Sequence, residues 1–226
     1  MGWSEWIRDG SEVEPSLYAA DFRRLGEQID ALLHAGCRVF HFDCGDGHFI
    51  PPVTMGPVVL RSIARGIHEA GGRLDCHLMV DDPAHHIEEF ASSGADSVTF
   101  HVEAAPQPAS VAERAREHGL GVGIAFNPET TPARAAEAAA EAGVDFVLCM
   151  SIHPGYSGQS FMPESLARIE ELHSLVGVPI QVDGGVGEGN IRALREAGVS
   201  LFVAGNSVFG AQDPTEAYVR LAAAAA

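Results

Sequence analysis

The 226-residue sequence contains no lysine, so all 14 of its basic residues are arginines, set against 31 aspartates and glutamates. The net charge of −17 argues against binding to nucleic acid or to an anionic membrane, because either needs a basic face. Schiff-base chemistry is excluded, since it needs a side-chain amine. The sequence has no basic, apolar signal peptide and no run near the roughly 20 apolar residues of a membrane span. We therefore expect a soluble, cytoplasmic protein.

Cysteine is scarce and its spacing excludes a common kind of metal site. The four cysteines are Cys37, Cys44, Cys76 and Cys149, and none belongs to a C-x-x-C pair. At least three of them lie in apolar, strand-like runs. We therefore predict buried, reduced thiols that pack as small apolar groups, and no zinc cluster made of cysteines.

Short β-rich runs alternate with helix-like stretches at a repeat of about 25 residues. The predicted strands are 12–18, 38–44, 73–80, 97–103, 121–127, 146–151, 179–183 and 201–204. The predicted helices are 22–35, 57–70, 83–93, 109–118, 132–142, 163–175, 190–197 and 215–225. Many of these helices end at a glycine, and the next strand starts within a few residues.

This alternation indicates parallel strands joined by helical crossovers. Eight such units in 226 residues predict an α/β fold, a single (β/α)8 TIM barrel. The rival is an open doubly wound sheet, which normally has a G-x-G-x-x-G turn after its first strand, and this sequence has none there. Residues 1–226 are expected to form one domain, with 1–11 as a short N-terminal extension.

Four polar residues stand near the carboxyl ends of predicted strands, where barrels of this kind carry their chemistry. His41 and Asp43 share one face of the second strand, His77 lies on the third, and Asp183 ends the seventh. Two imidazoles and two carboxylates suit one divalent ion, with zinc as the first choice and Mn, Fe(II) or Co compatible. A lone histidine at such a place is more often structural, but four convergent groups favour a metal site.

Two further histidines lie toward the same end of the predicted barrel. His48 follows the second strand and could pack a loop or support the site. His101, near the end of the fourth strand, faces inward and fits a structural role as well as a functional one.

Glycine-rich turns follow the last three predicted strands. These turns contain Gly155, Tyr156, Ser157 and Gly158; Gly184 and Gly185; and Gly205, Asn206 and Ser207. Glycines let backbone N–H groups approach an anion, and barrels often bind phosphate after strands seven and eight. Each turn alone is weak evidence, because tight turns need glycine anyway. Together they favour a phosphorylated ligand.

Several stretches in chain order are similar to those of one known family. They are Pro15-Ser16-Leu17, Ala20-Asp21-Phe22, His41-Phe42-Asp43, Cys76-His77-Leu78-Met79-Val80, His101-Val102-Glu103-Ala104, Asn127-Pro128, Pro154-Gly155, Gly158-Gln159 and Val182-Asp183-Gly184-Gly185. From about residue 14 to residue 210 the sequence resembles the ribulose-phosphate 3-epimerase family, metal-dependent ketose-phosphate 3-epimerases.

The resemblance implies epimerisation at C3 of a small phosphorylated ketose, most simply D-ribulose 5-phosphate to D-xylulose 5-phosphate in the pentose phosphate pathway. It implies a metal on His41, Asp43, His77 and Asp183, with Asp43 and Asp183 as an acid/base pair on opposite faces of the substrate. His77, Met79, Met150 and the glycine-rich turns named above would contact the substrate. It further implies a homo-oligomer.

The sequence departs from the family pattern at Ala19, Gly45, Pro52, His153 and Ser157. In place of Gly45 the family has a methionine, so we expect extra room that could admit another sugar, such as D-allulose 6-phosphate. A non-catalytic phosphosugar-binding barrel is a lesser alternative, because both Asp43 and Asp183 are present. Decarboxylases and synthases on related barrels usually use a strand-end lysine, which this sequence lacks.

Overall fold

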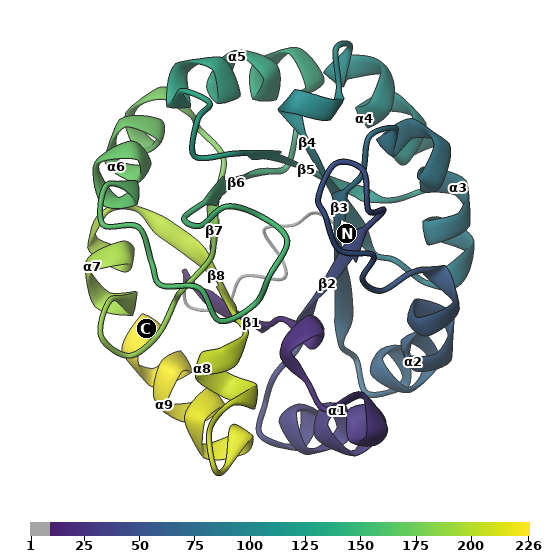
Figure 1. The fold of residues 1–226 in the computed structure, drawn as a ribbon, viewed down its shortest axis with the longest axis vertical. Helices are drawn as coiled ribbons and strands as arrows, with labels where there is room; N and C mark the ends of the chain where they lie inside the picture. The colour runs from purple at the N-terminus through teal and green to yellow at the C-terminus, as the bar shows by residue number, and fades with distance from the viewer. Residues whose placement is uncertain (1–9) are drawn as a thin grey trace.

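A computed structural model describes residues 10–226, in which eight parallel strands form a barrel inside a ring of helices (Figure 1). The strands are β1 Glu12–Pro15, β2 Val39–Gly45, β3 Arg73–Met79, β4 Ser97–His101, β5 Gly121–Phe126, β6 Phe146–Met150, β7 Ile180–Asp183 and β8 Val199–Ala204. Their order in the sheet is β1-β8-β7-β6-β5-β4-β3-β2. The predicted single (β/α)8 barrel is confirmed.

Helices connect successive strands on the outside of the barrel. They are α1 Leu25–His34, α2 Pro57–Glu69, α3 Pro83–Ser93, α4 Pro108–Glu117, α5 Pro132–Ala142, α6 Ser165–Leu175, α7 Ile191–Glu196, α8 Asn206–Phe209 and α9 Pro214–Ala225. Short 3-10 turns are η2 Leu17–Ala19, η3 Phe22–Arg24 and η4 Val102–Ala104. Five helices begin with proline, whose missing N–H costs nothing in the first turn of a helix.

Several elements differ from the sequence-based expectation. The predicted helix 22–35 begins as the 3-10 turn η3, and the predicted strand 97–103 ends at His101, where η4 begins. Two more differences concern the first strand and a short helix. The first strand stops at Pro15 rather than continuing to residue 18, because the chain turns into η2. Ser16 then forms a parallel bridge with His41, which brings β1 beside β2 and nearly closes the barrel. The short helix α8 was not predicted, since four residues carry too little periodicity to be recognised.

The barrel wall separates two kinds of packing. Outward-facing residues meet the helices, as where the rings of Phe42 in β2 and Phe90 in α3 lie 6.3 Å apart, edge to face. Inside, Val39, Phe146 and Leu201 form a small apolar cluster of their own. The four cysteines are buried and unpaired, as predicted. The site-forming polar residues of the strands also lie on the inner face, next to the apolar cluster of Val39, Phe146 and Leu201.

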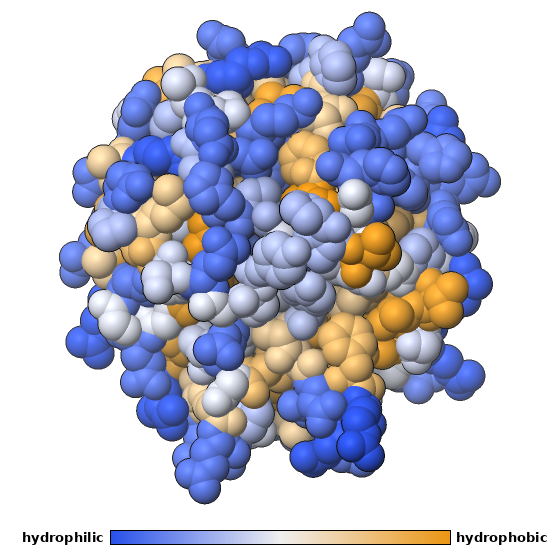
Figure 2. Space-filling model, viewed as in Figure 1, coloured by the Kyte–Doolittle hydropathy of each residue, from blue (hydrophilic) through white to orange (hydrophobic). Residues whose placement is uncertain are grey.

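Other expectations concern the chain ends and the surface. Most of the expected N-terminal extension, residues 1–9, lies outside the described residues. No helix in the described part of the chain has the length and apolar character to cross a membrane. Figure 2 shows a largely hydrophilic face, with orange side chains gathered over α2 and the loop before it. Val53 and Val58 in that region are 78% and 77% exposed.

Gly123 of β5 makes room for the inner apolar cluster. A Cβ atom there would lie 2.4 Å from Cζ of Phe146 and 2.3 Å from Oγ1 of Thr99. We predict that Gly123→Ala lowers the free energy of unfolding by about 1–3 kcal/mol, because overpacking forces the aromatic ring out of place. Urea denaturation would measure the change.

The matched control is Gly66→Ala in α2, where nothing lies within 4 Å of the added methyl group. Its expected effect is a stabilisation of about 0.5–1 kcal/mol, from helix propensity alone. Equal effects of the two substitutions would contradict this account of the barrel interior.

Candidate active site

The four predicted metal ligands come together at the carboxyl ends of three strands. His41 and Asp43 lie on β2, His77 on β3 and Asp183 at the end of β7. Each offers a ligand atom, and the four atoms lie within 4.8 Å of one another. Both histidine side chains are fully buried. The strand-end positions and the two-residue alternation therefore placed these side chains correctly.

Nitrogen atoms of both histidines face carboxylate oxygens. Nε2 of His41 is buried without a hydrogen-bond partner, 3.3 Å from Oδ1 of Asp43. Nδ1 of His77 lies 3.2 Å from that same oxygen and 3.8 Å from Oδ2 of Asp183. A buried, unpartnered imidazole nitrogen beside two carboxylates is the arrangement that a cation satisfies, and the N2O2 set suits a divalent metal ion. The residues present thus fit the predicted metal.

The surroundings drive the pKa values of the two carboxylic acids apart. Burial alone would raise the pKa of Asp43, but the charge of the neighbouring His41 outweighs it and holds that pKa well below its usual range. Burial raises the pKa of Asp183 to about 7, and the charge of Asp43 adds to the rise. Two carboxyl groups with separated pKa values can serve as one proton donor and one proton acceptor at the same pH.

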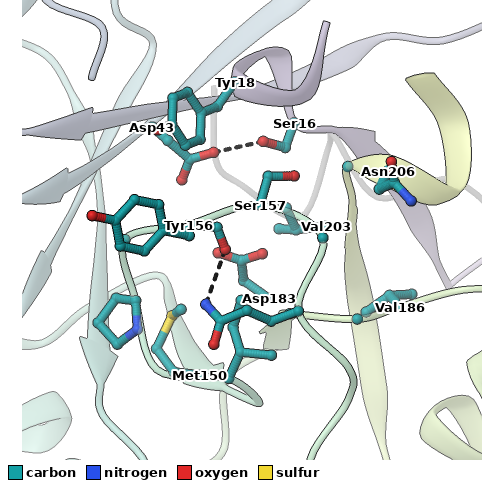
Figure 3. Close-up of a pocket in the computed structure, with 18 of the residues that line it drawn as sticks. Ser16, Tyr18, Asp43, Met150, Tyr156, Ser157, Asp183, Val186, Val203 and Asn206 are labelled. Carbon is teal, nitrogen blue, oxygen red and sulfur yellow. Dashed lines mark hydrogen bonds between the residues drawn. The ribbon is translucent and has the colours of Figure 1, made fainter. Parts of the chain in front are cut away.

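Ser16 is a site residue that the sequence-based prediction missed. Its hydroxyl donates a hydrogen bond of 2.6 Å to Oδ2 of Asp43 (Figure 3). The serine is buried just after β1, at the bridge to His41. Its place in a family-like stretch was the available signal, but its contact with a residue 27 positions away could not be read from a strand pattern.

A cavity of about 290 Å³ opens above Asp43 and Asp183. The predicted residues that line it are Asp43, Met79, Met150, Gly155, Tyr156, Ser157, Gly158, Asp183, Gly184, Gly185, Gly205, Asn206 and Ser207. Unpredicted lining residues are Ser16, Tyr18, Ile152, Pro154, Gln159, Val186, Gly187 and Val203. His77, predicted to contact the substrate, is not among the residues that line this cavity, and its side chain is fully buried.

The glycines after β7 are required by close packing. A Cβ atom on Gly184 would lie 2.5 Å from Ile152, and one on Gly185 would lie 2.3 Å from the backbone nitrogen of Phe161. At the same end of the cavity, the buried hydroxyl of Ser207 has no hydrogen-bond partner. This wall therefore offers backbone groups and a free hydroxyl to a polar ligand.

Gly45 does not enlarge the cavity, so this expectation was wrong. A Cβ atom at Gly45 would lie 2.4 Å from Cδ1 of Ile50, a fully packed side chain that occupies this space. Gly45 itself is not among the residues that line the cavity. The extra room that motivated a larger or different sugar is therefore filled.

The other departures from the family pattern lie around the cavity. The methyl group of Ala19 and the hydroxyl of Ser157 each lie 3.4 Å from where a Cβ of Gly205 would be. Pro52 lies 3.5 Å from the corresponding position on Gly155. Nδ1 of His153 lies 3.0 Å from a carboxylate oxygen of Glu129, and both side chains are exposed. Only Ser157 among these departures lines the cavity.

A buried polar layer lies beneath the ligand cluster. Nδ1 of His41 lies 3.1 Å from Oδ2 of Asp75, and the amide of Gln181 donates to that same oxygen at 2.9 Å and to Glu14 at 2.6 Å. Burial raises the pKa of Glu14 to about 7. Glu14, His41 and Asp75 form a second group whose ligand atoms lie within 4.8 Å of one another. The side-chain amide of Gln181 already donates hydrogen bonds to Glu14 and to Asp75. We therefore assign this polar layer the role of supporting the ligand cluster.

His48 and His101, the two further histidines predicted toward this end of the barrel, have different surroundings. Nδ1 of His48 lies 3.1 Å from the backbone oxygen of Asp46, so this side chain packs its own loop. His101 is fully buried, and its Nε2 lies 2.8 Å from Nε2 of His77. His101 therefore contacts a candidate ligand directly.

Comparisons with known proteins agree on one family. The family model described as the ribulose-phosphate 3 epimerase family matches residues 12–209. A ribulose-phosphate 3-epimerase of Escherichia coli (strain K12) is 36% identical over 206 residues, covering 89% of this chain and 90% of the relative. One from Candida glabrata is 36% identical over 218 residues, covering 90% and 88%.

A comparison with solved structures supports the fold. A 3-hexulose-6-phosphate synthase superposes with a TM-score of 0.74 and 23% identity, covering 95% of this chain and all of the other. At that identity the similarity speaks for the barrel architecture alone.

We predict that the purified protein binds Zn²⁺ and that His41→Ala weakens binding by at least about 100-fold, more than is usual for losing a group that only supports a ligand. Competition with a chelating zinc indicator measures the affinity. The control is His68→Ala, because Nε2 of His68 pairs with Asp96 at 2.8 Å, before β4 and away from the cluster. Unchanged Zn²⁺ affinity in His41→Ala would show that the metal binds elsewhere.

Proposed function

The chain belongs to the ribulose-phosphate 3-epimerase family, and from this premise we propose that it interconverts D-ribulose 5-phosphate and D-xylulose 5-phosphate. The reaction is an isomerisation that inverts C3 through an enediolate. One observation carries the proposal: Asp43 and Asp183 line the same cavity and belong to the cluster of candidate metal ligands, and their pKa values are driven apart.

The two carboxyl groups move the protons. One carboxylate removes the C3 proton, and the electron pair of the broken C–H bond forms the C2–C3 double bond while negative charge develops on the C2 oxygen. The other carboxylic acid then delivers a proton to the opposite face of C3, and the carbonyl re-forms. Each turnover exchanges the protonation of Asp43 and Asp183, and proton exchange with water restores it.

Ser16 has a positioning role in this scheme. Its hydroxyl holds one oxygen of Asp43, so the other oxygen stays directed toward the histidines and the cavity. A fixed carboxylate loses less conformational freedom when the substrate arrives.

We propose Zn²⁺ as the metal, held by His41, Asp43, His77 and Asp183. Two imidazole nitrogens and two carboxylate oxygens suit this borderline ion, and Mn, Fe(II) and Co share the preference. A divalent ion at this place supplies positive charge where negative charge develops on the substrate oxygens.

The phosphate of the sugar is assigned to the glycine-rich end of the cavity. Gly184, Gly185, Gly205 and Ser207 line that end, and the Ser207 hydroxyl is buried without a partner. Backbone N–H groups and a hydroxyl can bind a phosphate without lysine, which this sequence does not contain. Met79 and Met150 line the same cavity and supply apolar, polarisable contacts to the sugar.

We also propose a homo-oligomer in the cytoplasm. Val53, in the loop before α2, and Val58, on α2, are exposed and support self-association, because large apolar side chains gathered on a surface favour a protein contact. A doubly charged sugar phosphate does not cross a membrane, so the enzyme must share its compartment. Light scattering that gives the mass of a single chain would contradict the oligomer.

The catalytic assignment predicts that Asp43→Asn and Asp183→Asn each abolish epimerisation, because each removes the proton carrier of one face. Deuterium incorporation at C3 of ribulose 5-phosphate in D2O, followed by NMR on zinc-loaded protein, measures the proton transfer. The control is Asp82→Asn at the N-cap of α3, where asparagine caps as well as aspartate.

Near-wild-type epimerisation by either active-site variant would refute the two-base assignment. D-Allulose 6-phosphate is offered in parallel, and faster exchange at its C3 than at that of ribulose 5-phosphate would overturn the choice of substrate. Absence of exchange with both sugars in the wild-type protein would leave only a binding role.

A further inference from the structure

Three hydrogen-bonding side chains lie in a row, from His77 of the ligand cluster through His101 to Glu103. Nε2 of His77 and Nε2 of His101 lie 2.8 Å apart, and the two rings meet edge to edge, with centroids 5.0 Å apart and planes 22° apart. On its other side, Nδ1 of His101 lies 3.3 Å from Oε2 of Glu103. Both imidazoles are fully buried, so no water competes for these nitrogen atoms.

Glu103 is itself held firmly. Its Oε1 accepts the backbone N–H of Asn127 at 2.8 Å and the hydroxyl of Thr130, both from the segment that follows β5. Although partial burial would raise its pKa, the contacts with His101 and with that segment lower the pKa of Glu103 to about 2. Glu103 is therefore an ionised carboxylate at neutral pH and can only accept hydrogen bonds.

The ionised Glu103 determines which ring nitrogens of His101 and His77 carry hydrogen. Because Glu103 only accepts, Nδ1 of His101 carries hydrogen. In a neutral His101 ring, Nε2 then has a free lone pair. The short contact between the two Nε2 atoms needs one hydrogen, so it lies on His77. That leaves Nδ1 of His77 with its lone pair directed at Asp43 and Asp183.

His41 is supported in a simpler way. Its Nδ1 lies 3.1 Å from Asp75, and its Nε2 is the nitrogen that faces the cluster. The two candidate ligands thus present different nitrogens to the cluster, Nε2 of His41 and Nδ1 of His77. The other nitrogen of His41 faces Asp75 directly, and that of His77 is linked to Glu103 through the ring of His101. Such contacts orient metal-binding histidines and fix their tautomers.

We propose that His101 and Glu103 form a positioning pair that fixes His77 as an Nδ1 ligand of the metal centre. His101 and Glu103 touch neither the metal nor the substrate in this assignment. The inference rests on the proposed metal centre, and it adds the residues that set the affinity of that centre.

The test measures Zn²⁺ affinity by competition with a chelating indicator, in wild-type protein and in variants. In Glu103→Gln, the amide oxygen keeps the contacts with Asn127 and Thr130, so the amide N–H2 faces His101. Nδ1 of His101 must then accept a hydrogen bond, and its Nε2 must donate one to Nε2 of His77. His77 would then carry hydrogen on Nδ1, where the metal must bind. We expect a 10–100-fold loss of Zn²⁺ affinity, the usual cost of losing such support.

Two variants at position 101 separate positioning from packing. His101→Leu keeps an apolar volume but offers His77 no acceptor, and is expected to lose affinity to the same extent. His101→Gln can accept from His77 and donate to Glu103, so its affinity should lie closer to that of the wild type. His68→Gln, at the histidine paired with Asp96, is the matched control and should bind Zn²⁺ like the wild type.

A measurement on the unaltered protein completes the test. In zinc-loaded wild-type protein, imidazole 15N NMR is expected to show His77 with Nδ1 on the metal and hydrogen on Nε2. Coordination through Nε2, or wild-type Zn²⁺ affinity in both Glu103→Gln and His101→Leu, would overturn the positioning pair while leaving the metal centre intact. Wild-type protein that binds no Zn²⁺ at the cluster would refute the metal centre and the pair together.

Discussion

The burial of like charges inside a nearly closed barrel is the constraint to which the rest of this structure responds. Asp43, Asp75 and Asp183 lie close together around His41 and His77. Carboxylates repel one another strongly when water is excluded, so such a group is stable only with compensating positive charge or many hydrogen-bond donors. Ser16, Ser97 and Gln181 supply donors, and the proposed divalent ion would supply the charge.

The barrel interior satisfies this constraint in layers. The apolar cluster of Val39, Phe146 and Leu201 fills one part of it, and Gly123 leaves space for the aromatic ring. Next comes the polar layer of Glu14, Asp75 and Gln181, and beyond it the ligand cluster and the cavity. The candidate ligands and the cavity thus lie where the strands end, beside the loops that follow them.

The same charges give Asp43 and Asp183, the proposed acid/base pair, different proton affinities. Asp43 is held by His41 and by the hydroxyl of Ser16, which favour its ionised form. Asp183 is buried close to that charge, which favours its protonated form. Two chemically identical side chains therefore differ in proton affinity because of their neighbours, as a two-base inversion at carbon requires. Displacing either neighbour would disturb both groups.

The sequence by itself determined the barrel and the convergence of the four candidate ligands. Alternating strand and helix patterns predicted the fold, and a polar residue at a strand end with two-residue alternation placed His41, Asp43, His77 and Asp183. Both patterns are local, since each depends only on the residues within one element. Family-like motifs then linked these residues to a reaction, including the roles of Asp43 and Asp183.

Tertiary structure alone decided the contacts between elements that are distant in sequence. The hydroxyl of Ser16 meets Asp43, Nε2 of His101 meets Nε2 of His77, and Ile50 fills the space beside Gly45. A strand pattern shows which face a side chain occupies but not which neighbour it meets there. That depends on strand order, register and loop packing, which join residues across the whole chain.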